Sequence, residues 1–215
     1  MTQQRAGYGL DHNGSVPSPV WAGISNVQDV LLAAQGFQGF IHTPKFEGLS
    51  LRSLIPEDIY RFENFVRRLT RQALRQRFGC RSDPQPATIK RYMFESHHPD
   101  LVVQGVFDPT GEMVASVSVG QHLPTELELA LVVRSDLTGQ GLGSALMGAL
   151  DNWLGNLPII AIDAVLLVDN AIAVGMAMRR GFVAAGQSDR SIHLQKSLKS
   201  ATCSCCRTLA FEARH

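Results

Sequence analysis

Apolar residues recur with two different periods between residues 49 and 195, and the changes of period predict an α/β domain. Residues 49–54 alternate as in a strand, and Pro56, Glu57 and Asp58 then have the composition of a helix start. Beyond them, apolar side chains recur at helical spacing and define one buried helix face: Ile59, Phe62, Phe65, Val66 and Leu69. Two further helices are predicted over residues 70–78 and 88–95.

A meander of strands occupies the middle of the chain. Residues 101–107 and 113–119 are predicted strands, and the Asp-Pro-Thr-Gly turn at 108–111 between them predicts a hairpin. Further strands are predicted at 127–133, 159–168, 182–185 and 191–195, with helices at 144–154 and from Asn170 to Gly181. Because the early strands form a meander rather than βαβ units, the pattern predicts a mixed, mostly antiparallel sheet flanked by helices and disfavours a dinucleotide-binding fold.

The two ends of the chain differ from this core. Residues 1–45 are rich in Gly, Pro, Ser and Gln and are predicted to be a flexible leader with one short helix at 27–35. Residues 46–196 form the predicted domain and 197–215 a C-terminal tail. The tail carries Cys203, Cys205 and Cys206, which lack the spacing of a zinc site, so we expect an incidental cluster, with metal binding or modification as alternatives.

Bulk composition narrows the class of protein only slightly. The 215 residues suffice for one full core, and 45% hydrophobic and 18% charged residues are ordinary for a globular chain. A net charge of +1 gives no argument for nucleic acid or a membrane surface. The sequence has neither a long apolar run nor a signal-peptide pattern at its start, so a cytoplasmic location is expected.

Three closely spaced glycines stand where the strand at 127–133 meets the following helix. The window reads Gly139-Gln140-Gly141-Leu142-Gly143. Glycines let the backbone approach a ligand, and the first turn of a helix presents unpaired N–H groups together with the positive end of its dipole. Such a turn is suited to a phosphate or pyrophosphate, although glycine-rich turns are common.

A second segment makes this motif more specific. After the strand that ends near Val168 come Asn170, Ala173 and Met176, then Ala177, and the segment closes with Gly181-Phe182. Together with Thr138 to Gly143, this resembles the core of the GNAT acyltransferases, which bind acetyl-CoA. Two positions depart from the family pattern: Thr138 replaces a leading Gln or Arg, and Ala177 replaces a tyrosine that protonates the leaving thiolate in many members.

The strand before the glycines extends the resemblance. Glu128-Leu129-Ala130 and the following valines, with the alanine at 177, resemble the acetyltransferase domain of bacterial Pat-type protein lysine acetyltransferases. The resemblance covers roughly residues 46–196. It implies a sheet that splays at the acyl-CoA site, acetyl-CoA as co-substrate, and no metal. The residues that it implies in acetyl-CoA binding are Leu131, Val132, Val133, Thr138, Gly139, Gln140, Gly141, Leu142, Gly143, Ser144 and Asn170.

Several of these residues have alternative interpretations. One backbone N–H of the 131–133 segment is expected to stabilise the oxyanion, and Asn170 either bonds the pantetheine arm or caps the last helix. Seven arginines are either a solvated helical face or a surface for the CoA 3′-phosphate or an acidic protein: Arg61, Arg67, Arg68, Arg71, Arg75, Arg77 and Arg81.

Acyl transfer to an amine needs a group that accepts a proton. Strand parity places Glu126, Glu128 and Ala130 on one face, and the context of Glu128 matches the Pat-type strand, so Glu128 is the predicted general base. Glu126 is the weaker candidate, both glutamates could be exposed strand positions, and His122 is expected in a loop.

The leading hypothesis is an acetyl-CoA-dependent N-acetyltransferase that acts on an amine, foremost a protein lysine. A small-molecule amine acetyltransferase and a non-catalytic acyl-CoA sensor, favoured by the missing tyrosine, remain as alternatives. Partners are therefore acetyl-CoA and an amine acceptor, without nucleic acid or membrane, and the sequence does not define an oligomeric state.

Overall fold

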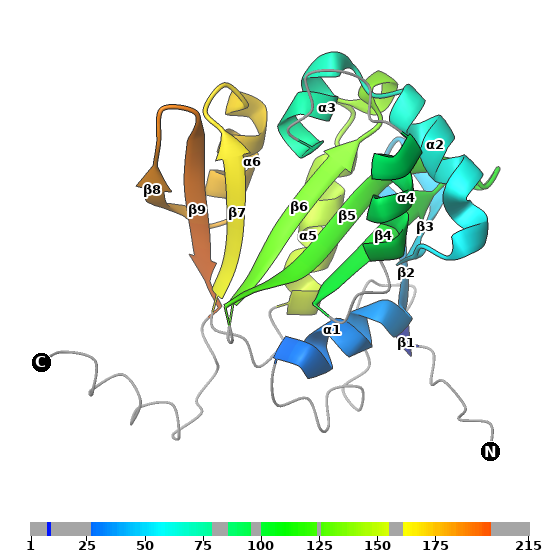
Figure 1. The fold of residues 1–215 in the computed structure, drawn as a ribbon, viewed down its shortest axis with the longest axis horizontal. Helices are drawn as coiled ribbons and strands as arrows, with labels where there is room; N and C mark the ends of the chain where they lie inside the picture. Colours follow the sequence, from blue (N-terminus) through cyan, green and yellow to red (C-terminus); the bar gives the residue numbers. More distant parts are fainter. Residues whose placement is uncertain are drawn as a thin grey trace, which may run out of the picture.

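The computed structural model describes residues 8–9, 27–78, 86–95, 100–123, 126–154 and 161–198. These residues form one nine-stranded sheet in the order β1-β2-β3-β4-β5-β6-β7-β9-β8 (Figure 1). Neighbouring strands run antiparallel except in the pairs β1–β2 and β6–β7. The strands are β1 (Tyr8–Gly9), β2 (Phe37–Thr43), β3 (Phe46–Ser53), β4 (Leu101–Phe107), β5 (Met113–Leu123), β6 (Glu126–Val133), β7 (Ala161–Leu167), β8 (Val183–Gln187) and β9 (Ser191–Ser197).

Helices cover both faces of this sheet. They are α1 (Val27–Gly36), α2 (Ile59–Arg67), α3 (Arg71–Phe78), α4 (Pro86–Glu95), α5 (Leu142–Leu154) and α6 (Ala171–Arg179), with short 3₁₀ turns at Pro56–Asp58 and Ser135–Leu137. The core of one face includes α1, α5 and Ala177 of α6, and the core of the other includes α2, α3 and Met93 of α4. The mixed, mostly antiparallel architecture predicted from the sequence is confirmed.

The folded region begins before the boundary that the sequence indicated. Strand β2 pairs with β3, and Val30 and Leu31 of α1 are fully buried. Residues 27–43 are thus part of the sheet and the core, which corrects the flexible leader predicted over 1–45. Residues 1–7 and 10–26 of the leader lie outside the described residues, as does the tail from residue 199 on, which carries Cys203, Cys205 and Cys206. No helix in the described ranges is long and apolar enough to cross a membrane.

Strand β2 offers a matched pair of phenylalanines that tests this correction. Phe37 is 4% exposed and its ring centroid lies 5.6 Å from that of Trp153 in α5, whereas Phe40 is 49% exposed. We expect Phe37→Ala to lower the free energy of unfolding by about 3–5 kcal/mol because it leaves a cavity in the core. Phe40→Ala should change it by about 0.5 kcal/mol or less. Urea denaturation of both variants measures the difference, and equal small effects would contradict the assignment of β2 to the core.

A buried carboxylate holds the start of α2 against β3. Asp58 is fully buried and accepts hydrogen bonds from both terminal nitrogens of Arg52, at 2.5 and 2.8 Å, and from the Ile55 N–H at 3.0 Å. Arg61 lies 3.1 Å from the same carboxylate. Burial alone would raise the pKa of Asp58, but the Arg52 and Ile55 hydrogen bonds and the two guanidinium charges hold that pKa below its usual value.

The lowered pKa sets the pH range in which this contact stabilises the fold. A carboxyl group whose pKa is lower in the folded chain adds stability above its unfolded pKa, and that stability is lost as pH falls through the folded value. We expect Asp58→Asn to lower the free energy of unfolding by about 1–3 kcal/mol at neutral pH. The deficit should shrink as the pH falls below about 4, because the carboxyl group is then protonated in the unfolded wild-type chain and, at still lower pH, in the folded chain. Denaturation curves at several pH values test this, with Asp189→Asn at an exposed turn as control; a deficit that persists unchanged in acid would exclude the ionic explanation.

Candidate functional site

Strands β6 and β7 separate after a short parallel contact. They pair only between Glu126–Glu128 and Ala161–Asp163, and β7 continues as a partner of β9 alone (Figure 1). Strand β6 meanwhile stays paired with β5 up to Val133. The sheet therefore opens between β6 and β7 at its centre, where the sequence predicted a splay.

The opening exposes one backbone edge of β6. The Arg134 N–H donates to the Val114 carbonyl at 2.9 Å, so the backbone of Arg134 faces β5. In an antiparallel pair this orientation alternates along the strand, so Val132 also faces β5, whereas Leu129, Leu131 and Val133 turn their N–H and C=O groups toward the gap. Of the segment 131–133, only Leu131 and Val133 can thus offer backbone donors to a ligand in the gap.

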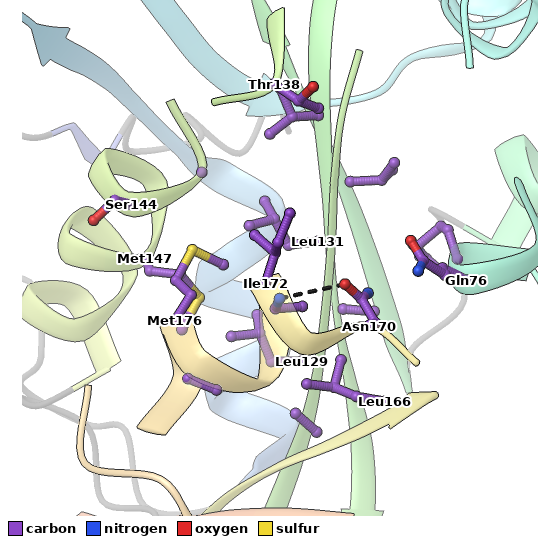
Figure 2. A pocket seen from close by; sticks show the side chains of 18 of the residues that line it. Gln76, Leu129, Leu131, Thr138, Ser144, Met147, Leu166, Asn170, Ile172 and Met176 are labelled. Carbon is purple, nitrogen blue, oxygen red and sulfur yellow. Dashed lines mark hydrogen bonds between the residues drawn. The ribbon is translucent and has the colours of Figure 1, made fainter. Parts of the chain in front are cut away.

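A cavity of about 440 Å³ lies in this opening. Its walls come from β6 and β7, the glycine turn, the first half of α5, α6, and three residues of α3: Ala73, Gln76 and Arg77. Figure 2 shows its apolar lining, which includes Leu129, Leu131, Met147, Leu166 and Met176. The volume lies within the range of small-molecule sites.

The glycine turn adopts backbone conformations that other residues avoid. Gly139 and Gly141 have φ angles of 72° and 91°, and a Cβ added to either would meet no protein atom within 4 Å. Glycine is thus required at both positions by the left-handed backbone, and the space in front of them is free. A Cβ on Gly143, at the start of α5, would make only ordinary contacts, the nearest 3.6 Å from Met176 Sδ.

Most of the predicted binding residues line the cavity. They are Leu131, Val132, Val133, Thr138, Gly139, Gly141, Leu142, Gly143, Ser144 and Asn170. Gln140 does not, because its side chain turns back and donates to the Asp136 carbonyl at 3.2 Å. Ser144 is held from α6, since Arg180 donates to its carbonyl oxygen at 2.7 Å and lies 3.3 Å from its hydroxyl oxygen.

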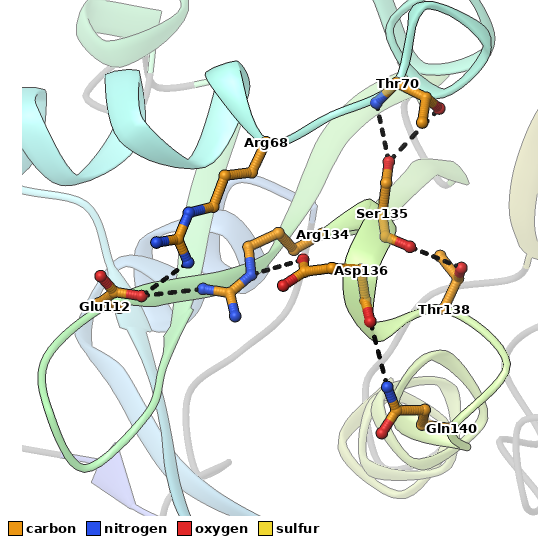
Figure 3. Close-up of polar contacts among 8 residues, drawn as sticks. All are labelled: Arg68, Thr70, Glu112, Arg134, Ser135, Asp136, Thr138 and Gln140. Carbon is orange, nitrogen blue, oxygen red and sulfur yellow. Dashed lines mark hydrogen bonds and ion pairs between the residues drawn. The ribbon is translucent and has the colours of Figure 1, made fainter.

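A charged network that the sequence analysis did not predict holds the segment between β6 and the glycine turn (Figure 3). Arg134, 8% exposed, donates to Asp136 at 2.8 Å and to Glu112 at 3.1 Å, and Glu112 also accepts from Arg68 at 2.9 Å. The Ser135 hydroxyl accepts from the Thr70 N–H at 2.8 Å and so ties α3 to the same segment. The network fixes the path from β6 to α5. The only signal in the sequence was an arginine placed directly after an apolar strand.

Two positions on the α6 side bear on the sequence predictions. The Asn170 side-chain oxygen accepts from the Ala173 N–H at 3.3 Å, as an N-cap does, and Asn170 also lines the cavity (Figure 2). The cap uses the oxygen, so the amide nitrogen is the atom that could contact a ligand. Ala177 is 5% exposed and packs in the core beside the cavity, where its methyl group offers no acid.

The two glutamates of β6 share a face but differ in surroundings. Val132 belongs to the core on the α2–α4 side, and strand parity places Glu126 and Glu128 on that side too. Glu128 is exposed and lines the cavity. Glu126 is not part of that lining; partial burial and the neighbouring Asp163 carboxyl raise its pKa. His122, expected in a loop, belongs to the end of β5.

The predicted arginine cluster divides into several roles. Arg67 and Arg68 form surface ion pairs with Glu63 and Glu112, Arg61 contacts Asp58, and Arg75 of α3 contacts Asp169 beside the start of α6. Arg77 differs, because it lines the cavity and is held by the Ser118 hydroxyl at 2.7 Å and by the Tyr92 hydroxyl. Arg81 lies outside the described residues.

Comparison with known families identifies the class to which this splayed sheet and glycine turn belong. Residues 66–182, more than half of the chain, match the model of the Acetyltransferase (GNAT) family. The chain therefore belongs to the GNAT acetyltransferase family, whose members use acetyl-CoA.

Individual relatives agree with this assignment. Acetyltransferase Pat of Mycolicibacterium smegmatis is 31% identical over 138 residues, 62% of this chain and 39% of that protein, so the chain spans about two fifths of the relative's length. The crystal structure of the GNAT domain of S. lividans PAT superposes with a TM-score of 0.61 at 20% identity, covering 70% of this chain and 90% of that domain. Spermidine N-acetyltransferase from Vibrio cholerae, in complex with CoA and spermine, has a TM-score of 0.58 at 18% identity, covering 70% and 95%. At these identities, the structural likenesses show a shared fold.

Proposed function

We propose that this protein transfers an acetyl group from acetyl-CoA to an amine, and that the amine is foremost a lysine side chain of a protein. The observation that carries the proposal is the gap between β6 and β7, which joins a free backbone edge, a 440 Å³ cavity and an anion-suited helix start in one continuous site. The relation to acetyltransferase Pat supports a protein lysine as acceptor.

The glycine turn is suited to the pyrophosphate of the co-substrate. Gly139 and Gly141 leave free space before them, and the first N–H groups of α5 lie next to them. Unpaired N–H groups and the helix dipole favour a negative charge at that point. The apolar wall formed by Leu131, Met147 and Met176 then suits the pantetheine arm.

The backbone of β6 and the side chain of Glu128 supply the chemical groups. An N–H of Leu131 or Val133 faces the gap and would donate to the oxyanion that forms when the amine attacks the thioester carbonyl. Glu128 accepts the proton that the amine loses, directly or through a water. Ala177 stands where many members have a tyrosine, so the side chain at this position does not protonate the departing thiolate. A thiol with a pKa of about 8.5 is a good enough leaving group to depart as the thiolate.

The exposure of Glu128 favours a macromolecular acceptor over an enclosed small molecule. A lysine side chain is long enough to reach a carboxylate at the protein surface, whereas a small amine needs walls around it. A small-molecule amine, such as a polyamine, remains the second candidate acceptor, because exposed Glu128 and partly buried Glu126 lie on the same face of β6 and favour a cationic substrate.

A screen for CoA release tests the proposal. Purified protein and acetyl-CoA are incubated with lysine-containing proteins or peptides, with polyamines and with aminoglycosides, and free thiol is measured. We expect acceptor-dependent release with protein lysines, confirmed by mass increase at a lysine. Release only with small amines would shift the assignment to the second candidate. Tight acetyl-CoA binding without release by any acceptor would instead favour a non-catalytic sensor.

A further inference from the structure

A second polar cluster lies at the point where β5, β6 and β7 come together, outside the cavity lining. His122 ends β5, Glu126 begins β6, and Asp163 lies within β7. One nitrogen of His122 and one carboxylate oxygen from each acid lie within 4.8 Å of one another. Three neighbouring strands of the sheet thus bring one imidazole and two carboxylates to the same spot.

Asp163 provides an independent sign that a ligand is missing from this cluster. The residue is 1% exposed, and its Oδ1 atom is 2.6 Å from His193 Nε2 and accepts from Gln195 Nε2 at 3.1 Å. Its Oδ2 atom is buried and has no hydrogen-bond partner in the described structure. A buried carboxylate oxygen without a partner is costly, because it has lost water and gained nothing in exchange.

The charges around the cluster do not balance. One carboxylate oxygen of Glu126 and one of Asp163 lie within 4.8 Å of each other, so two negative charges there would repel. Glu128 adds a third carboxylate two residues along the same face, and its Cα is paired with that of Asp163. Within the described ranges, the one ion pair of Asp163 is with His193, and no arginine or lysine contacts either acid. A cation between the two carboxylates would offset this repulsion.

We infer that His122, Glu126 and Asp163 bind one divalent transition-metal ion of the Zn²⁺ class. The donor set of one imidazole and two carboxylates matches that class, and water can complete the coordination because His122 is exposed. The three donor atoms now lie within 4.8 Å of one another. Modest side-chain adjustment would place each of them at about 2.0–2.2 Å from a single ion between them. Two carboxylates and a neutral imidazole would leave the site electrically neutral.

A second layer of side chains already orients these ligands. Gln195 donates to Asp163 and lies 3.5 Å from Glu126, and His193 fixes Oδ1 so that Oδ2 is left for the ion. Metal-binding carboxylates and imidazoles are typically held by such outer hydrogen bonds. The ion would join β5, β6 and β7 at the point where β6 and β7 begin to separate, and so would fix the angle of the opening. This role does not depend on the proposed acetyl transfer.

Metal titration of the full chain tests the inference. Protein treated with a chelator and then dialysed is titrated calorimetrically with Zn²⁺, Mn²⁺, Mg²⁺ and Ca²⁺. We expect one Zn²⁺ per chain, a rise in melting temperature on binding, and weak or absent Mg²⁺ and Ca²⁺ binding. Asp163→Asn and His122→Ala should remove this binding, and Gln195→Ala should weaken it by about 10–100-fold.

The control variants separate this cluster from other zinc ligands. His42→Ala removes an exposed histidine of β2 and should leave binding unchanged. Replacement of Cys203, Cys205 and Cys206 by serine removes the thiolates of the tail and should also leave it unchanged. If Asp163→Asn does not fold, His122→Ala decides the matter, because it alters an exposed side chain. Wild-type Zn²⁺ affinity in a folded His122→Ala variant, binding lost with the cysteines, or no stoichiometric binding at all would each overturn the inference.

Discussion

Glu128→Gln is expected to slow acetyl transfer by about 10²–10⁴-fold at pH 7 while acetyl-CoA binding stays unchanged. Glutamine keeps the size and hydrogen bonding of Glu128 but does not accept a proton. A lysine amine with a pKa of about 10.4 must lose its proton before it attacks, which costs roughly 4–5 kcal/mol at pH 7. The rate gap between variant and wild type should narrow at high pH, where more of the amine is already neutral.

Steady-state transfer rates from pH 6 to 9, with acetyl-CoA affinity measured by calorimetry, provide the test. Glu47→Gln is the matched control, because Glu47 is an exposed strand glutamate of β3 outside the cavity lining. Glu126→Gln should slow transfer less than Glu128→Gln, since Glu126 does not line the cavity. Wild-type turnover of Glu128→Gln over the whole pH range would show that another group accepts the proton.

Gly141→Glu is expected to abolish measurable acetyl-CoA binding while the fold is kept. The new carboxylate would occupy the free space before the turn, where the pyrophosphate is proposed to bind. Like charges a few ångströms apart at a protein surface repel by up to about 4 kcal/mol, so an affinity loss of at least about 100-fold is expected. Gly141→Ala adds the backbone strain without the charge and should weaken binding less.

Gly111 supplies a control with the same backbone strain. Its φ angle is 82°, close to the 91° of Gly141, and it lies in the turn between β4 and β5, outside the cavity lining. Gly111→Ala should therefore cost stability comparable to that of Gly141→Ala and leave acetyl-CoA affinity at the wild-type level, since its added methyl group would meet only Arg61 Nε, at 4.0 Å. Calorimetric titration and thermal melting of the three variants separate the two effects. Wild-type affinity in a folded Gly141→Glu variant would remove the glycine turn from the proposed site.

Local signals in the sequence explain why the central elements could be predicted. The hairpin of β4 and β5 follows from an Asp-Pro-Thr-Gly turn between two apolar runs, and the glycine turn follows from three closely spaced glycines. Both signals are complete within about ten residues. Strand β2 lacks such a signal, because its buried positions are Phe37, Gly39 and Ile41, one of them a glycine inside a glycine-rich stretch. Its burial depends on pairing with β3 and packing against Trp153, which lies far away in the chain.

Among the polar residues of the site, too, those set by local sequence could be predicted and those set by long-range contacts could not. Glu128 could be predicted, because strand parity and its neighbours on β6 are local. The contact of Asp163 with His193 and Glu126 could not, since it depends on β9 pairing with β7 and on β7 meeting β6 for only three residues. The direction of the Gln140 side chain could not be predicted either, because within a turn it depends on the φ angles of the neighbouring glycines.

The free edge of β6 also bears on how such a site can evolve. Main-chain N–H and C=O groups are the same for every residue except proline, so a site that uses Leu129, Leu131 and Val133 through their backbones places few demands on side-chain identity. Alanine scanning along this strand would miss such recognition, whereas a single proline at residue 131 would remove a donor. A chain of this kind can exchange most of its residues and still hold the same ligand, provided that the two strands continue to part at the same place.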